Sequence, residues 1–79
     1  MESRPMGTTT NIWTCNDLAQ ALRQRRRALG IRQADAAAAL GYSPRLISEI
    51  ENGRDTVAYG KILRYAEYLA MNVLVQERG

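Results

Sequence analysis

The stretch GIRQADAAAALGYSPRLISEIENG, from Gly30 to Gly53, decides the fold of this chain because it encodes two short helices that meet at a turn. Residues 33 to 40 are rich in alanine, and Gly41 at their end suits the left-handed conformation that often terminates a helix. Ser43 is a favoured N-cap, and Pro44 suits the first position of the next helix. Two helices joined by so short a turn must cross steeply, as in a helix-turn-helix.

The same stretch resembles the helix-turn-helix of the lambdoid phage repressors and related bacterial regulators, the Xre/lambda-repressor-like family, over roughly residues 17 to 70. The residues that carry the resemblance are Gly30, Gln33, Ala37, Leu40, Gly41, Ser43, Ile47, Ser48, Ile50 and the run Glu51-Asn52-Gly53. The segment after Gly53, RDTVAYGKILRYAEYLAMNVLVQ, lacks the fifth helix of the phage repressors and is similar to the HipB branch, antitoxins that end in a strand. The resemblance implies an all-α, four-helix DNA-binding domain whose short C-terminal strand pairs across a dimer.

Length and composition limit the possible fold classes and cellular locations without reference to any family. A chain of 79 residues makes one domain with a small core, because only about 60% of the unfolded surface is buried at this size. The single cysteine, Cys15, excludes an intramolecular disulfide and fits a reducing compartment. No apolar run approaches the roughly 20 residues of a membrane span, and the polar amino terminus has no signal-peptide core. We expect a soluble, cytoplasmic and nucleoid-associated protein.

Positive charge is concentrated around the proposed helix-turn-helix. The net charge is +3 at pH 7, but residues 23 to 45 hold six arginines against one acid, Asp35. Such a cluster is either an electrostatic footprint for phosphates or a solvated helix face that favours solubility. Because the arginine cluster coincides with the predicted helix-turn-helix, we favour nucleic acid as the partner.

The segments on either side of the helix-turn-helix determine the expected domain boundaries. We expect residues 1–12 to form a flexible tail, residues 13–70 the helix-turn-helix domain, and residues 71–79 a dimerisation strand and tail. Thr14 and Asp17 have the spacing of a capping box, and Trp13 and Leu18 that of a hydrophobic staple. The first helix should therefore start near Thr14 and continue to about residue 29.

Helical spacing also predicts which residues are buried. In the first helix these are Leu18, Ala21, Leu22 and Leu29. A last helix, at about residues 57–69 with Thr56 as its cap, should bury Ile62, Leu63, Ala66 and Leu69. Tyr59, Tyr65 and Tyr68 should be half-buried.

The second helix departs from the family pattern at two positions. Arg32 stands where a Thr or Ser N-cap is usual, and an arginine cannot accept an amide hydrogen bond, which weakens that end by about 1 kcal/mol. Asp35 in the first turn offsets part of this loss through the helix dipole. Arg32 either gains a phosphate contact or is a tolerated surface substitution. Ala36 replaces a leucine, and Tyr42 and Leu46 are candidates to fill the space.

Matching to the family's motif assigns the DNA contacts. The predicted base-contact residues are Pro44, Arg45, Ser48 and Glu49, and the predicted phosphate-contact residues are Arg32, Gln33 and Ser43. Arg45 is the strongest candidate because its fork matches the two acceptors on a guanine edge. Pro44 offers only apolar contact, for example to a thymine methyl. Glu49 either accepts from a cytosine amino group, or stays off the DNA or pairs with Arg45.

Two further features follow from the resemblance and from the C-terminal pattern. Arg26 and Glu51 match positions that form a largely buried ion pair in the phage repressors. The alternation after Met71 indicates a strand whose predicted dimerisation residues are Asn72, Val73, Leu74, Val75 and Gln76. An isolated strand needs a partner, and the same segment of a second subunit would supply it. Fraying of residues 70–79, or pairing with a toxin alone, are the competing interpretations.

Catalytic chemistry has little support in this sequence. It has no histidine, no evident pair of carboxylates, no phosphate-cradling glycine loop and no cluster with metal-ligand spacing. We therefore predict a protein that is not an enzyme, with no catalytic residues, no cofactor and no metal.

The leading interpretation is a sequence-specific repressor that binds an inverted-repeat operator in double-stranded DNA as a homodimer. The HipB-like ending implies an antitoxin that binds a HipA-type kinase toxin and represses their operon. The alternatives are a stand-alone phage-type or controller repressor, and a protein-interaction adaptor with the same fold. Gln33, Ser43 and Arg45 on one surface argue against the adaptor.

Overall fold

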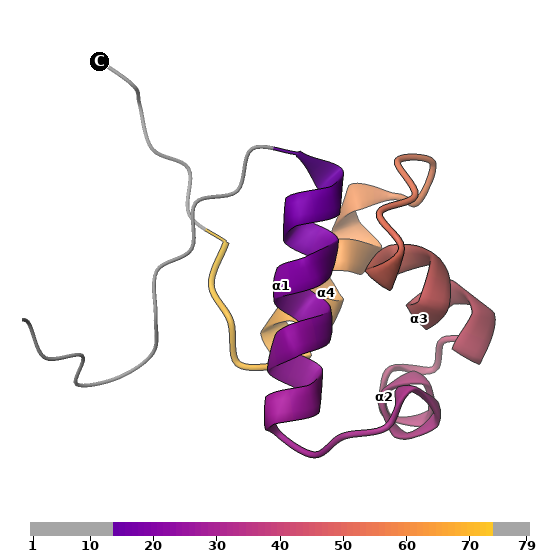
Figure 1. Ribbon diagram of the computed structural model, residues 1–79. Helices are drawn as coiled ribbons and strands as arrows, with labels where there is room; N and C mark the ends of the chain where they lie inside the picture. The colour runs from indigo at the N-terminus through magenta and orange to yellow at the C-terminus, as the bar shows by residue number, and fades with distance from the viewer. Residues whose placement is uncertain (1–13, 74–79) are drawn as a thin grey trace, which may run out of the picture.

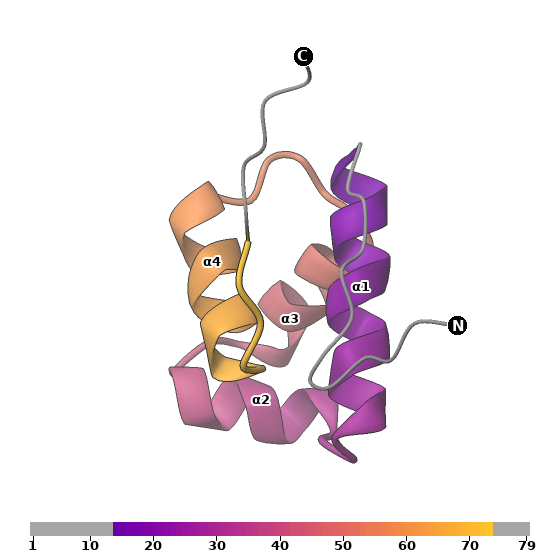
Figure 2. The same ribbon diagram turned by 90° about the vertical axis from the view of Figure 1, so that its left-hand side faces the viewer.

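Four α-helices make up the part of the chain that the computed structural model describes, residues 14–73. They are α1 (Cys15–Ala28), α2 (Gln33–Leu40), α3 (Pro44–Glu51) and α4 (Tyr59–Tyr68). Figure 2 shows α1 and α4 upright on opposite sides, with α3 between them and α2 crossing below, whereas Figure 1 shows α4 behind α1 and places α2 and α3 to their right. The predicted all-α, four-helix fold is confirmed. None of these helices has the length and apolar character needed to cross a membrane.

Helix α1 begins and ends where its local sequence predicts. The Asp17 amide donates to the Thr14 hydroxyl at 3.1 Å and the Thr14 amide donates to the Asp17 carboxylate at 3.1 Å, which is a capping box. After the helix, Gly30 has a φ of +72°, a conformation that glycine adopts at low cost. Trp13, the other half of the predicted staple, lies outside the described residues.

The turn between α2 and α3 sets the steep crossing of these two helices. Gly41 ends α2 with a φ of +72°, and two residues later the Ser43 hydroxyl accepts from the Leu46 amide at 3.1 Å. Pro44 takes the first position of α3. At the other end of α2, Arg32 is the N-cap residue and its side chain makes no capping hydrogen bond, as expected.

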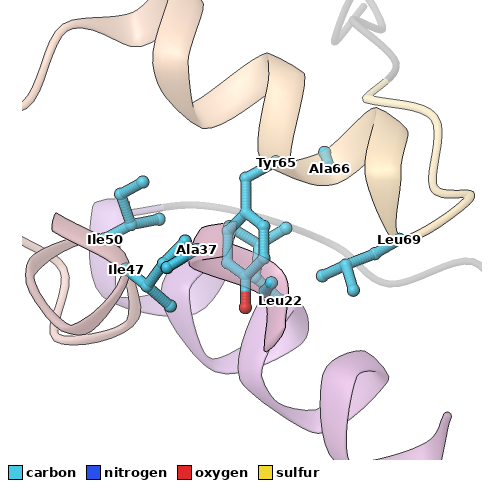
Figure 3. Packing of buried hydrophobic residues seen from close by; sticks show 8 residues of the cluster. Leu22, Ala37, Ile47, Ile50, Tyr65, Ala66 and Leu69 are labelled. Atoms are coloured by element: carbon cyan, nitrogen blue, oxygen red, sulfur yellow. The ribbon is translucent and has the colours of Figure 1, made fainter. Parts of the chain in front are cut away.

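All four helices contribute to one hydrophobic core. Its buried members are Leu22, Ala36, Ala37, Ile47, Ile50, Tyr65, Ala66 and Leu69. In Figure 3 the Tyr65 ring extends from α4 toward Leu22, with Ile47 on one side and Leu69 on the other. Truncating a core aliphatic side chain such as Leu22 to alanine costs about 2–5 kcal/mol in proteins generally. This core therefore holds much of the stability of a small domain.

Several burial predictions are wrong. Leu29 is 44% exposed because it follows the last residue of α1 as its C-cap. Leu63 is 38% exposed because the side of α4 that faces the core carries Tyr65, Ala66 and Leu69, which are buried, and the partly buried Ile62, so that Leu63 lies beside this stripe. Tyr65 is fully buried and Tyr59 is 55% exposed, although both were expected to be half-buried. Tyr42 and Leu46 are partly buried and pack against the core.

Helix α4 starts later than predicted. Its first residue is Tyr59, and the N-cap residue is Ala58, which has no side-chain group to accept a hydrogen bond. Thr56 is therefore not the cap, since it lies two residues before the N-cap position. Packing of the apolar stripe against the core, rather than a cap, fixes this helix end.

The predicted C-terminal strand is not confirmed. Asn72 and Val73 have no regular secondary structure, and Leu74, Val75 and Gln76 lie outside the described residues, as does the predicted tail at residues 1–12. Val73 is nevertheless packed against the core as a half-buried residue. The chain leaves α4 through Ala70, which has a φ of +59°.

Candidate nucleic-acid interface

The four predicted base-contact residues share one outward surface of α3. Pro44 and Arg45 are exposed, Ser48 and Glu49 lie one turn further along at the i+4 positions, and both are half-buried. The opposite side of the helix carries Ile47 and Ile50, which are in the core. Helix α3 therefore presents one proline and three polar side chains outward, while its opposite side is packed in the core.

Arg45 and Glu49 interact with each other on this surface. The Arg45 Nε atom lies 3.4 Å from a Glu49 carboxylate oxygen, and the Arg45 side chain is 88% exposed. An exposed ion pair of this kind contributes about 0.2–1 kcal/mol. It is therefore weak enough for a guanine edge to compete for the arginine.

The predicted phosphate-contact residues lie at the starts of α2 and α3, and each already has a protein partner. Ser43 caps α3, and Arg32 pairs with Asp35 with an Nε–Oδ2 distance of 3.1 Å. Gln33 donates from Nε2 to Glu51 Oε1 at 3.1 Å. The Ser43 hydroxyl hydrogen and the other guanidinium donors of Arg32 remain available to an anion.

Glu51, at the end of α3, accepts hydrogen bonds from all three other helices. Arg26 of α1 donates from Nε at 2.7 Å and from Nη2 at 3.0 Å, Gln33 of α2 donates to the same carboxylate, and so does the Tyr65 hydroxyl of α4. Arg26 also donates from Nη1 to the Ile31 carbonyl at 2.8 Å. Arg26 is 8% and Glu51 3% exposed. The ion pair that the resemblance implied is thus the centre of a network that joins four helices.

The network fixes the protonation state of its members. Burial disfavours the charge of Glu51, but hydrogen bonds from Arg26, Tyr65 and Gln33 outweigh this and hold the pKa of Glu51 below its usual range. The hydrogen bond to Glu51 raises the pKa of Arg26. Burial, followed by the hydrogen bond to Glu51, raises the pKa of Tyr65, so its hydroxyl stays protonated and donates.

Two contacts were not predicted from the sequence. Tyr65 joins the network, and one signal for it was its place between Ile62 and Leu69 at helical spacing, because a buried tyrosine hydroxyl needs a partner. Arg25 donates from Nε to the Leu69 carbonyl at 2.9 Å and so joins α1 to the end of α4. No local pattern connects residues this far apart in the sequence.

Comparisons with known proteins agree with this architecture. A family model described as a helix-turn-helix domain matches residues 17–77. No curated protein matches the sequence. A chain from the complex of a HipB variant with the O2 20mer is similar with a TM-score of 0.83 and 22% identity, over 91% of this chain and 100% of that chain. A chain of the HipA-HipB-O2-O3 complex gives a TM-score of 0.82 and 21% identity, over 90% and 100% of the two chains. Likeness at this identity shows a shared fold.

Proposed function

The chain belongs to the helix-turn-helix domain family, and from this premise we propose that it is a sequence-specific DNA-binding repressor that acts as a homodimer. The observation that carries the proposal is the contrast between the two sides of α3. Its inner side is held by Ile47, Ile50 and the buried Glu51, while Pro44 and Arg45 on its outer side are exposed. A rigid helix with a free polar face is suited to enter a major groove.

In the proposed complex, α3 reads base edges and the starts of the helices position the protein. Arg45 leaves Glu49 and donates two hydrogen bonds to a guanine, and Glu49 accepts from a neighbouring cytosine amino group. Ser48 donates to a base edge, and Pro44 contacts a thymine methyl. Arg32, Gln33 and Ser43 bind phosphates, which sets the register without reading sequence. Their residual donors support this role.

We further propose that the protein is an antitoxin that binds a HipA-type kinase toxin and represses the operon that encodes both. The support is the similarity in fold to a chain of the HipA-HipB-O2-O3 complex, which is matched over its whole length. A stand-alone repressor needs the same DNA surface and no toxin. A pure protein-interaction adaptor does not need Gln33, Ser43 and Arg45 on one surface.

The dimer interface in this proposal is the segment Asn72 to Gln76, paired antiparallel with its copy across a two-fold axis. Residues 13–70 then form the DNA-binding domain, and residues 71–79 the dimerisation strand and tail. Val73 packs against the core of its own subunit, which would hold the strand close to α4. Two recognition helices fixed in this way would read half-sites about 34–36 Å apart.

A mobility shift on DNA from upstream of the protein's own gene tests the proposal. Binding that survives competition by unrelated duplex supports a sequence-specific repressor, and a kinase-like neighbouring reading frame whose product co-purifies supports the antitoxin. Specific binding without such a neighbour favours the stand-alone repressor. Failure to bind either duplex contradicts DNA binding and leaves the adaptor.

A further inference from the structure

An open cleft of about 470 Å³ lies where the second half of α1 meets the start of α2 and the end of α3. Four arginines line it, Arg23, Arg26, Arg27 and Arg32, against a single acid, Glu51. The cleft is therefore basic, and an anion is the ligand whose charge it complements.

Two of these arginines are already neutralised by acids. Arg26 forms the buried pair with the glutamate of the cleft, and Arg32 pairs with Asp35. Arg23 is half-buried and Arg27 is exposed, and within residues 14–73 no acid pairs with either one. They stand at i and i+4 on α1, so both guanidinium groups reach the same patch of surface.

The opposite wall of the cleft also offers a hydrogen-bond donor. Asn52 donates from Nδ2 to the Ser48 Oγ atom at 3.3 Å, which leaves the Ser48 hydroxyl hydrogen free to donate. Glu51 does not oppose an anion strongly, because both of its oxygens accept hydrogen bonds and Arg26 balances its charge. Within residues 14–73, Arg23 and Arg27 thus have no acid partner, while the carboxylate of the cleft is occupied.

We propose that Arg23 and Arg27 form a DNA-phosphate site that extends the contact surface from the helix-turn-helix onto α1. Three residues of the predicted DNA-contact set, Arg32, Gln33 and Ser48, line the same cleft. A DNA backbone that contacts the two predicted phosphate-contact residues among them, Arg32 and Gln33, passes the cleft, and its adjacent phosphate is the anion that Arg23 and Arg27 bind. This inference rests on the proposed function, since the phosphate belongs to duplex DNA.

A phosphate contact leaves a signature that separates it from base reading. Each phosphate neutralised adds about 0.9 to the magnitude of the slope of log K against log salt concentration. Loss of the site should therefore weaken binding to all sequences alike, and should weaken it most at low salt. Base preference should stay unchanged.

The experiment compares Arg23→Gln, Arg27→Gln and the double variant with the wild type and with Lys61→Gln. Lys61 is exposed on α4 and does not line the cleft, so its variant loses the same charge elsewhere. Affinity for the upstream duplex and for an unrelated duplex is measured over a salt series. We expect the magnitude of the slope to fall by about 1.8 for the double variant on both duplexes, because the proposed dimer loses one phosphate contact from each subunit, and to change little for Lys61→Gln.

The outcomes distinguish this inference from the proposed function. A wild-type protein that binds neither duplex overturns both. A wild-type protein that binds, with equal slopes for the double variant and Lys61→Gln, overturns the phosphate site alone. Saturable binding of inorganic phosphate that depends on both arginines, without a change in the DNA slope, assigns the cleft to a free anion and also overturns the inference. If Arg23→Gln lowers the melting temperature, its effect on binding could come from misfolding. The salt slope of Arg27→Gln alone then tests the site, because Arg27 is exposed.

Discussion

The Tyr65 hydroxyl of α4 donates to Oε2 of Glu51, the same carboxylate oxygen that accepts from Arg26 Nε at 2.7 Å. One atom at the end of α3 is thereby held from two sides. Because Gln33 binds the other carboxylate oxygen at 3.1 Å, the position of α3 depends on α1, α2 and α4 together. The surface that faces DNA in our proposal is therefore preorganised by buried polar contacts as well as by apolar packing.

Removing either member of the central ion pair should destabilise the domain strongly. Arg26→Ala or Glu51→Ala leaves the other charge buried without its partner, and such changes cost about 3–5 kcal/mol. Arg27→Ala is the matched control, because this neighbour is exposed and makes no ion pair among the described residues. Urea unfolding followed by circular dichroism measures the difference. Equal midpoints for Arg26→Ala and Arg27→Ala would refute a structural role for the pair.

Removing only the Tyr65 oxygen should have a smaller but clear effect. Tyr65→Phe keeps the buried ring and deletes one of the donors to Glu51, which we expect to cost about 1–3 kcal/mol in the free energy of unfolding. Tyr59→Phe provides the control, since Tyr59 is 55% exposed. A Tyr65→Phe variant as stable as Tyr59→Phe would show that this hydrogen bond contributes nothing net.

Stability should fall at both ends of the pH range. The pKa of Glu51 is lowered in the folded state, so its contribution is present above the unfolded value of about 4.5 and is lost as the pH falls toward the folded pKa. The pKa of Tyr65 is raised, so its contribution is present below the unfolded value of about 10 and is lost as the pH rises above it. Melting temperatures from pH 2 to 11 test this. Tyr65→Phe should flatten the alkaline limb, and a limb that keeps its slope contradicts the assignment.

Local signals in the sequence predicted the ends of α1, α2 and α3 but not the start of α4, and tertiary contacts decided the burial that these signals did not predict. Thr14, Gly41 and Ser43 act within a few residues of their own position, so their roles can be read from spacing. The burial of Tyr65 and the exposure of Leu63 depend on which side of α4 meets the core, and the helix is apolar enough to allow more than one orientation. The link between Arg26 and Glu51 came from the family resemblance, because no local pattern joins α1 to α3.

Base reading and backbone contact should respond differently to mutation. Arg45→Ala should relax specificity, since loss of a bidentate contact to guanine removes about 1–3 kcal/mol of discrimination at one position. Arg32→Ala should weaken all sequences alike, as expected for a phosphate contact. Gln33→Ala should do so too, but it also removes a donor to Glu51, so its melting temperature must be checked. Binding-site selection with each variant makes the measurement. An unchanged base preference for Arg45→Ala would remove Arg45 from the set of base readers.

Dimerisation should depend on the segment Asn72 to Gln76. An isolated strand leaves unpaired amides and carbonyls, and a two-fold copy of the same strand satisfies them. We expect a chain that ends at Ala70 to be monomeric by light scattering at micromolar concentration, and to bind DNA more weakly because the two half-sites are no longer linked.

The truncation also removes Met71 and Val73, which pack against the core, so a milder variant is needed. Val75→Pro keeps both residues and deletes one amide donor in the middle of the predicted strand. Arg78→Pro, beyond the strand, is its control. The strand is the interface if Val75→Pro is monomeric while Arg78→Pro remains dimeric. Folding is controlled by measuring melting temperatures at a dilution at which all three proteins are monomeric, where both variants should match the wild type. A truncated chain that stays dimeric places the interface elsewhere, and leaves fraying or pairing with a toxin as the interpretations of the C-terminal segment.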